Sequence, residues 1–186
     1  MDRSYSALKT VGLWFVAAGV LALLRAVIEL AEPAYWSPES LLDYTAVILT
    51  SAASAVAAIA LFLWWRATPI RRGSFLLLIA AIATAVGDSL GNLLEDVFDL
   101  EIGEWLFSNV GQVSLYAMMA AGIVILTVRG TYRWTGLFLL LYIAGFTFPD
   151  DGGQFLSGIS LLGLGYWITR YANKRSQETA AQTART

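Results

Sequence analysis

The residues in this chain that could do chemistry are a few polar side chains inside long apolar stretches, and Asp88 is the most prominent of them. An ionised group in the hydrocarbon of a membrane costs roughly 2.5 to 3.5 kcal/mol on insertion scales, so it is expected to face protein or water and to have a partner. Asn92 and Glu95 follow Asp88 at i+4 and i+7, which places all three on one face of a helix. This spacing predicts a polar stripe that could bind a cation or a small polar solute.

A second polar stripe is predicted on the next apolar segment, where Asn109, Gln112 and Tyr116 have the spacing i, i+3 and i+7. If that segment re-enters the membrane from the side at which the preceding one leaves it, these side chains lie at the depth of Asp88 and Asn92. The two stripes are therefore expected to face each other and to line a shared polar cavity.

Other ionisable residues are expected to complete this site. Arg25 has Glu29 one turn further along the first apolar stretch, and Arg25 is expected to pair with Glu29 or Asp88 because it is the only cation predicted in the outer half of the molecule. Asp43 is expected at the same level. The predicted binding residues are Arg25, Glu29, Asp43, Asp88, Asn92, Asn109, Gln112, Tyr116 and Asp151.

Asp151 enters this set through a weak internal similarity. Residues 66–78 align with residues 129–141 without a gap, with matching Arg, Thr, Gly, Phe and Leu positions, and the same alignment places Asp88 on Asp151. Chance similarity of two basic loops entering lipid and true duplication are both compatible with this match.

The composition excludes many kinds of catalysis. The chain has no cysteine and no histidine, which excludes disulfides, thiolate nucleophiles, Cys/His zinc sites and every Ser–His or Cys–His catalytic pair. Neither a cofactor nor a metal site is predicted. The net charge of −2 gives no reason to expect a nucleic-acid partner. Any chemistry would use carboxylates, amides, hydroxyls or arginine.

The elements that must position these side chains are six apolar stretches, which predict an all-α, polytopic transmembrane helical bundle. The chain is 58% hydrophobic and only 14% charged, so its solvent is expected to be lipid. The first four stretches can span about 30 Å of hydrocarbon at about 1.5 Å per residue, whereas the last two are short. The predicted helices cover residues 8–30, 41–65, 74–97, 105–128, 134–148 and 155–171, in one domain of residues 1–175, and residues 176–186 are predicted to be a disordered cytoplasmic tail.

The connections predict that both termini are cytoplasmic and that the chain is a multi-pass protein of the plasma membrane. Retained cytoplasmic loops carry an excess of Lys and Arg, and here every second connection is basic while the others are acidic. The residues that carry the basic signal are Arg3, Lys9, Arg66, Arg71, Arg72, Arg129, Arg133, Arg170, Lys174 and Arg175. Tryptophans, including Trp134 and Trp167 at the inner boundary, fit interfacial belts.

Two functions from different classes are open. One is a binding or translocation protein with an acidic polar cavity facing outward, which would favour a cation or a small amine-bearing solute. The other is a non-catalytic accessory subunit, whose polar residues join helices to each other, to a membrane-protein partner or to a second copy. Small residues at Ala83, Gly87 and Gly91 also predict close packing against another helix.

A third function follows from a resemblance. The Gly87–Asp88 pair in a membrane helix, with Asp151 in a later one, resembles the lysoplasmalogenase family of membrane hydrolases. The resemblance covers only these residues. It implies an acid–base hydrolase of a lipid, which would need one carboxyl group protonated and the other ionised.

Overall fold

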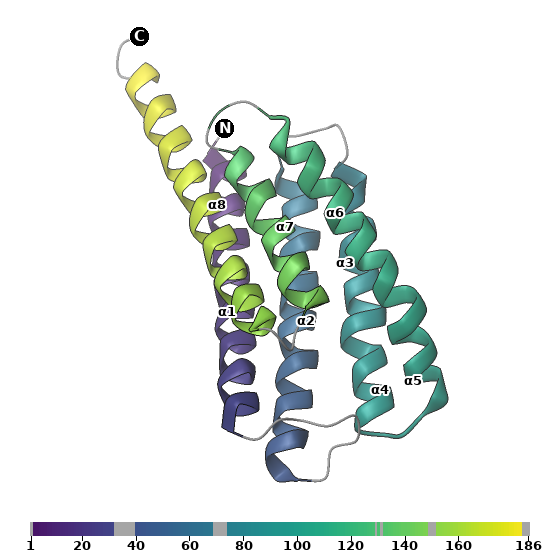
Figure 1. Cartoon of the computed structure of the whole chain (residues 1–186). Helices are drawn as coiled ribbons and strands as arrows, with labels where there is room; N and C mark the ends of the chain where they lie inside the picture. Colours follow the sequence, from purple (N-terminus) through teal and green to yellow (C-terminus); the bar gives the residue numbers. More distant parts are fainter. Residues whose placement is uncertain are drawn as a thin grey trace.

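The computed structural model is a bundle of long helices (Figure 1). It describes residues 2–31, 40–68, 74–128, 130, 132–148 and 152–183, and among these no β-strand occurs. The elements are α1 (Asp2–Ala31), α2 (Leu41–Ala67), α3 (Ser74–Ala83), η1 (Thr84–Gly91), α4 (Asn92–Asp96), α5 (Glu101–Trp105), η2 (Leu106–Gly111), α6 (Gln112–Leu126), α7 (Arg133–Thr147) and α8 (Gly153–Thr183). The segments η1 and η2 are π-helical, and they join their flanking helices into two continuous helices, α3–η1–α4 and α5–η2–α6.

Four of the six resulting helices are long and apolar enough to cross a membrane. These spans are Tyr5–Leu30, Leu41–Ala67, Ser74–Asp96 and Glu101–Leu126. The fifth helix, Arg133–Thr147, is apolar but shorter, and α8 is long but mixes apolar residues with polar ones. The prediction of an all-helical protein is therefore confirmed for the described residues, and four of its helices are candidate membrane spans by length and composition.

The carboxy-terminal tail differs from the prediction. Residues 176–183 continue α8 as helix instead of being disordered, and residues 184–186 lie outside the described part of the chain. Extending an existing helix needs no new nucleation, and the tail contains the good helix formers Ala180 and Ala181. An ion pair of 3.2 Å between Arg175 and Glu178, spaced i, i+3, supports this extension.

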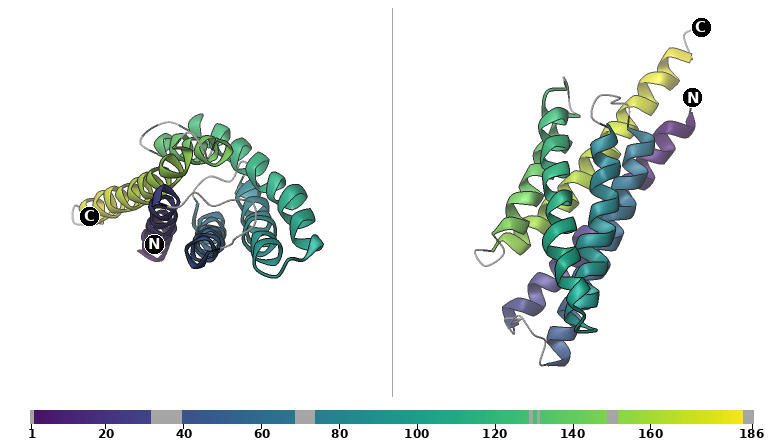
Figure 2. Two further views of the ribbon diagram at one scale, coloured as in Figure 1. Left: turned by 60° about the horizontal axis from the view of Figure 1, so that its bottom comes forward. Right: turned by 90° about the vertical axis from the view of Figure 1, so that its right-hand side faces the viewer.

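The six helices form a closed circuit of neighbours. α1 packs against α2 and α8, α3–η1–α4 lies between α2 and α5–η2–α6, and α7 lies between α6 and α8. Figure 2 shows the helices following one another around the molecule in this order. The start of α1 and the end of α8 lie at the same end of the bundle (Figure 1).

The apolar core lies in the half of the bundle that holds the termini. Its largest fully buried side chain, Trp64, packs edge-on against Phe15 with ring centroids 5.6 Å apart. The Trp64 indole N–H donates a 2.6 Å hydrogen bond to the hydroxyl of Tyr132, which also bonds Thr68 at 3.0 Å. Burial raises the pKa of Tyr132, so its hydroxyl keeps its proton and can satisfy both partners.

The opposite half has a different composition. α7 ends and α8 begins near mid-height, so this half consists of α1, α2, α3–η1–α4 and α5–η2–α6 (Figure 1). Its buried residues include several polar ones: Asp43, Ser51, Ser54, Asp88 and Ser114. This half therefore holds the candidate site.

Candidate functional site

Asp88 is buried inside the bundle, with only 3% of its surface exposed. The Ser114 hydroxyl, from α6, donates a 2.7 Å hydrogen bond to Asp88 Oδ2. The same hydroxyl lies 2.7 Å from the backbone oxygen of Gly111. A hydroxyl has one hydrogen, so Ser114 can satisfy only one of these acceptors at a time. Asp88 thus shares the Ser114 donor with the Gly111 backbone oxygen, and the buried Thr84 hydroxyl lies close enough to be a second donor.

The site around Asp88 is built from two π-helical segments that pack against each other, η1 and η2. Their backbones nearly touch: a Cβ added to Gly87 would lie 2.6 Å from the Cα of Gly111, and one added to Gly111 would lie 2.7 Å from Asp88 Oδ1. At Gly91 the nearest atom to an added Cβ is the Phe107 backbone nitrogen, at 2.7 Å. The predicted close packing through the small residues of this helix is confirmed. π-Helical turns are rare and often mark functional sites.

The second predicted stripe does not face Asp88. Asn109, Gln112 and Tyr116 are all exposed, with Tyr116 at 64%, and the Asn109 amide only donates to the Trp105 backbone oxygen at 2.9 Å. The prediction of two facing stripes is wrong. The close approach of η1 and η2 leaves room only for small side chains, so Gly111 and Ser114 occupy the facing positions.

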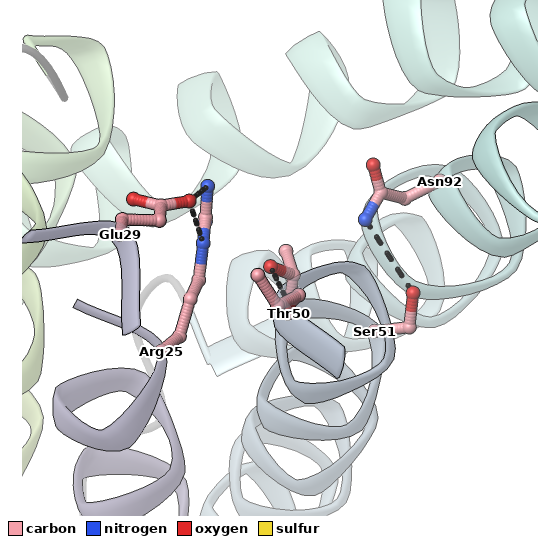
Figure 3. Close-up of polar contacts among 6 residues, drawn as sticks. Arg25, Glu29, Thr50, Ser51 and Asn92 are labelled. Atoms are coloured by element: carbon pink, nitrogen blue, oxygen red, sulfur yellow. Dashed lines mark hydrogen bonds and ion pairs between the residues drawn. The ribbon is translucent and has the colours of Figure 1, made fainter. Parts of the chain in front are cut away.

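The stripe on Asp88's own helix is divided between two neighbours. Asp88 faces α6, whereas Asn92 lies toward α2, with its amide nitrogen 3.4 Å from the Ser51 hydroxyl (Figure 3). Ser89 also reaches α2, donating a 2.9 Å hydrogen bond to the Ser51 backbone oxygen. Hydrogen bonds of this kind hold membrane helices together, so Asn92 has a structural role in the described contacts.

Arg25 pairs with Glu29, one of its two predicted partners. Arg25 Nη2 and Nε lie 2.7 and 2.8 Å from Glu29 Oε1 (Figure 3). Arg25 and Asp88 form no direct ion pair among the described residues.

The two remaining predicted residues do not join this group in the described structure. Asp43 forms a capping box at the start of α2, exchanging hydrogen bonds of 3.0 and 3.1 Å with Ser40. This arrangement satisfies the helix terminus. Asp151 lies outside the described residues.

Sequence reasoning missed Ser114 and Ser51. These serines lie where two helices approach closely, and a short hydroxyl side chain is less conspicuous in an apolar stretch than an amide or a charge. Gly111, three residues before Ser114, was the usable signal, because a glycine inside a membrane helix often marks a close helix contact.

Comparisons with protein-family models, with curated proteins and with solved structures find no match. The resemblance to lysoplasmalogenases therefore gains no support from them.

Electrostatic asymmetry is the second feature of the site. The described part of the end away from the termini, here called the acidic end, has Arg25 as its only Lys or Arg. Its carboxylates are Glu29, Asp43, Glu95, Asp96, Asp99, Glu101 and Glu104. The described part of the opposite end, here called the basic end, carries Lys9, Arg66, Arg133, Arg170, Lys174 and Arg175. Among the described residues, no group of three or more acidic side chains is arranged to hold a metal ion.

Proposed function

We propose that this chain binds a cation or small amine-bearing solute at Asp88 and moves it across the membrane. The observation that carries the proposal is the state of Asp88, which is 3% exposed, has only the neutral hydroxyls of Ser114 and Thr84 as side-chain donors and is joined to no ion pair within the described residues. At about 1.5 Å per residue, Asp88 lies about 21 Å and about 12 Å from the two ends of Ser74–Asp96. Such a position suits a transported ion better than a stable surface contact.

The two charge-separated ends support the proposal. The carboxylates of the acidic end raise the local concentration of cations and disfavour anions. The basic end corresponds to the cytoplasmic side under the positive-inside rule, which gives both termini a cytoplasmic location in the plasma membrane and makes the acidic end the outer mouth. Since the chain has no cysteine, single cysteines at Leu100 and Arg66 test the orientation. Leu100 should react with an impermeant thiol reagent in intact cells and Arg66 should not, and the reverse pattern would overturn it.

The function is tested by Asp88→Asn in reconstituted vesicles, with uptake of Na⁺, K⁺ and methylammonium as the measurement. The substitution keeps the shape of the side chain and removes its charge, so uptake should be lost while the protein still folds and inserts. Glu104→Gln is the matched control, because it removes an exposed carboxylate at the acidic end and should change uptake far less. Wild-type uptake by Asp88→Asn at an unchanged melting temperature would refute the proposal.

One observation favours the accessory-subunit alternative. Asn109, Gln112 and Tyr116 present polar groups on the exposed face of a helix long enough to span the membrane. Amides facing hydrocarbon are costly unless a partner covers them. If this alternative is correct, Asn109→Leu with Gln112→Leu should abolish co-purification of a partner or second copy, while Asp88→Asn should have no effect on it.

A further inference from the structure

Two arginines of the basic end lie against a pair of stacked tryptophans on the surface of α7 and α8. Trp134 and Trp167 stack with ring centroids 6.0 Å apart and planes inclined by 27°. The Arg133 guanidinium carbon lies 5.3 Å from the centre of the Trp134 ring, and that of Arg170 lies 5.0 Å from the centre of the Trp167 ring. The four side chains, here called the Arg–Trp cluster, come from two different helices.

Tyr166 completes the surface. Its ring lies 6.0 Å from the Arg170 guanidinium and its hydroxyl accepts a 3.3 Å hydrogen bond from Arg170 Nη1. Arg133 and Arg170 are both exposed, as are Trp134 at 37% and Tyr166 at 56%. The cluster is therefore accessible and only partly apolar.

Neither arginine has a carboxylate partner in the described structure, where the ion pairs are Arg25–Glu29 and Arg175–Glu178. Contact with an aromatic ring uses the face of a guanidinium and leaves its N–H edges available, apart from the Arg170 Nη1–H that donates to Tyr166. The rings also restrict the arginine rotamers, which lowers the entropic cost of ordering them on a ligand. The N–H edge of each guanidinium matches the oxygens of a phosphate group.

We propose that the Arg–Trp cluster binds the phosphate of an anionic phospholipid. A membrane lipid is favoured over a free phosphate ion because the arginines adjoin exposed indole and phenol rings, which suit the boundary between headgroups and acyl chains. The cluster also belongs to the basic end, where anionic lipids of the inner leaflet attract arginine. The proposal is independent of Asp88 and of transport.

The test reconstitutes the protein in phosphatidylcholine containing a growing fraction of brominated phosphatidylglycerol. Bromine quenches nearby tryptophan fluorescence, so quenching beyond that by brominated phosphatidylcholine reports preferential binding. At about fivefold for each arginine near a membrane surface, the preference should be about 25-fold. Arg133→Gln with Arg170→Gln should abolish this preference. The lysine pair, Arg133→Lys with Arg170→Lys, should keep only part of the preference, because lysine lacks the planar fork of arginine.

Arg66→Gln is the matched control, since Arg66 is an exposed arginine of the same end on α2. It should keep most of the preference. A loss equal to that in Arg133→Gln with Arg170→Gln, or full retention in Arg133→Lys with Arg170→Lys, would show that general surface charge is responsible and would overturn the proposal. Trp134→Phe with Trp167→Phe should remove the excess quenching, and persistence would place the lipid elsewhere. Inorganic phosphate should not compete, and competition would identify an ion site instead. Melting temperatures in pure phosphatidylcholine identify any variant that fails to fold. If the glutamine pair fails to fold, Arg133→Lys with Arg170→Lys is used in its place.

Discussion

Adding one methyl group at the contact between the two π-helical segments should damage both stability and the site. In Gly87→Ala the new Cβ would lie 2.6 Å from the Gly111 Cα, whereas carbon atoms pack at about 3.5 Å or more. The helices must therefore separate by about 0.9 Å. Overpacking of this kind costs about 1–3 kcal/mol. The same shift would lengthen the 2.7 Å bond from Ser114 to Asp88 to about 3.6 Å, beyond hydrogen-bond range.

The assay is thermal unfolding followed by tryptophan fluorescence, together with uptake in vesicles. For a chain of this size, about 1–3 kcal/mol corresponds to a fall in melting temperature of roughly 2–12 °C. Gly111→Ala should lose uptake with a smaller fall in melting temperature, because its new Cβ meets the movable carboxylate of Asp88 and not the backbone. Ala17→Val, on an exposed position of α1, controls for added volume. An unchanged melting temperature in Gly87→Ala would contradict the close contact.

Three further outcomes are expected. Ser114→Ala removes the hydroxyl donor from a buried carboxylate and should cost about 1–3 kcal/mol of stability, measured as the melting temperature; no change would mean that the bond is not formed. Arg25→Met leaves the charge of Glu29 uncompensated, so Glu29→Gln should partly restore its melting temperature while Asp88→Asn should not, and the opposite pattern would contradict the observed pairing. Because burial raises the pKa of Tyr132, the folded protein keeps a proton that the unfolded chain loses, and stability should fall as pH rises above about 10. Tyr132→Phe should make that fall shallower in melts across this range, and an identical fall would show that another group is responsible.

Length and hydropathy alone predict most of the architecture, because a membrane helix satisfies its own backbone and needs only an apolar run of sufficient length. The predicted stretches at residues 41–65, 74–97 and 105–128 agree closely with α2, α3–η1–α4 and α5–η2–α6. The helix of residues 176–183 was not predicted, because its extension depends on α8 already being formed. The composition of these residues indicates only a polar tail and does not show that they continue α8.

The candidate site depended far more on tertiary structure. The presence of a buried carboxylate at Asp88 follows from one charged residue within an apolar run. Its partner does not, because the direction of a side chain on the neighbouring helix depends on how closely the two backbones approach and on the register of η2. Glycine contacts at Gly87 and Gly111 bring Ser114 to the carboxylate and turn Gln112 outward. Projecting the sequence onto a regular helix assumes a constant number of residues per turn, and it does not say which helix lies alongside. Only the packed structure therefore decides which residues face Asp88.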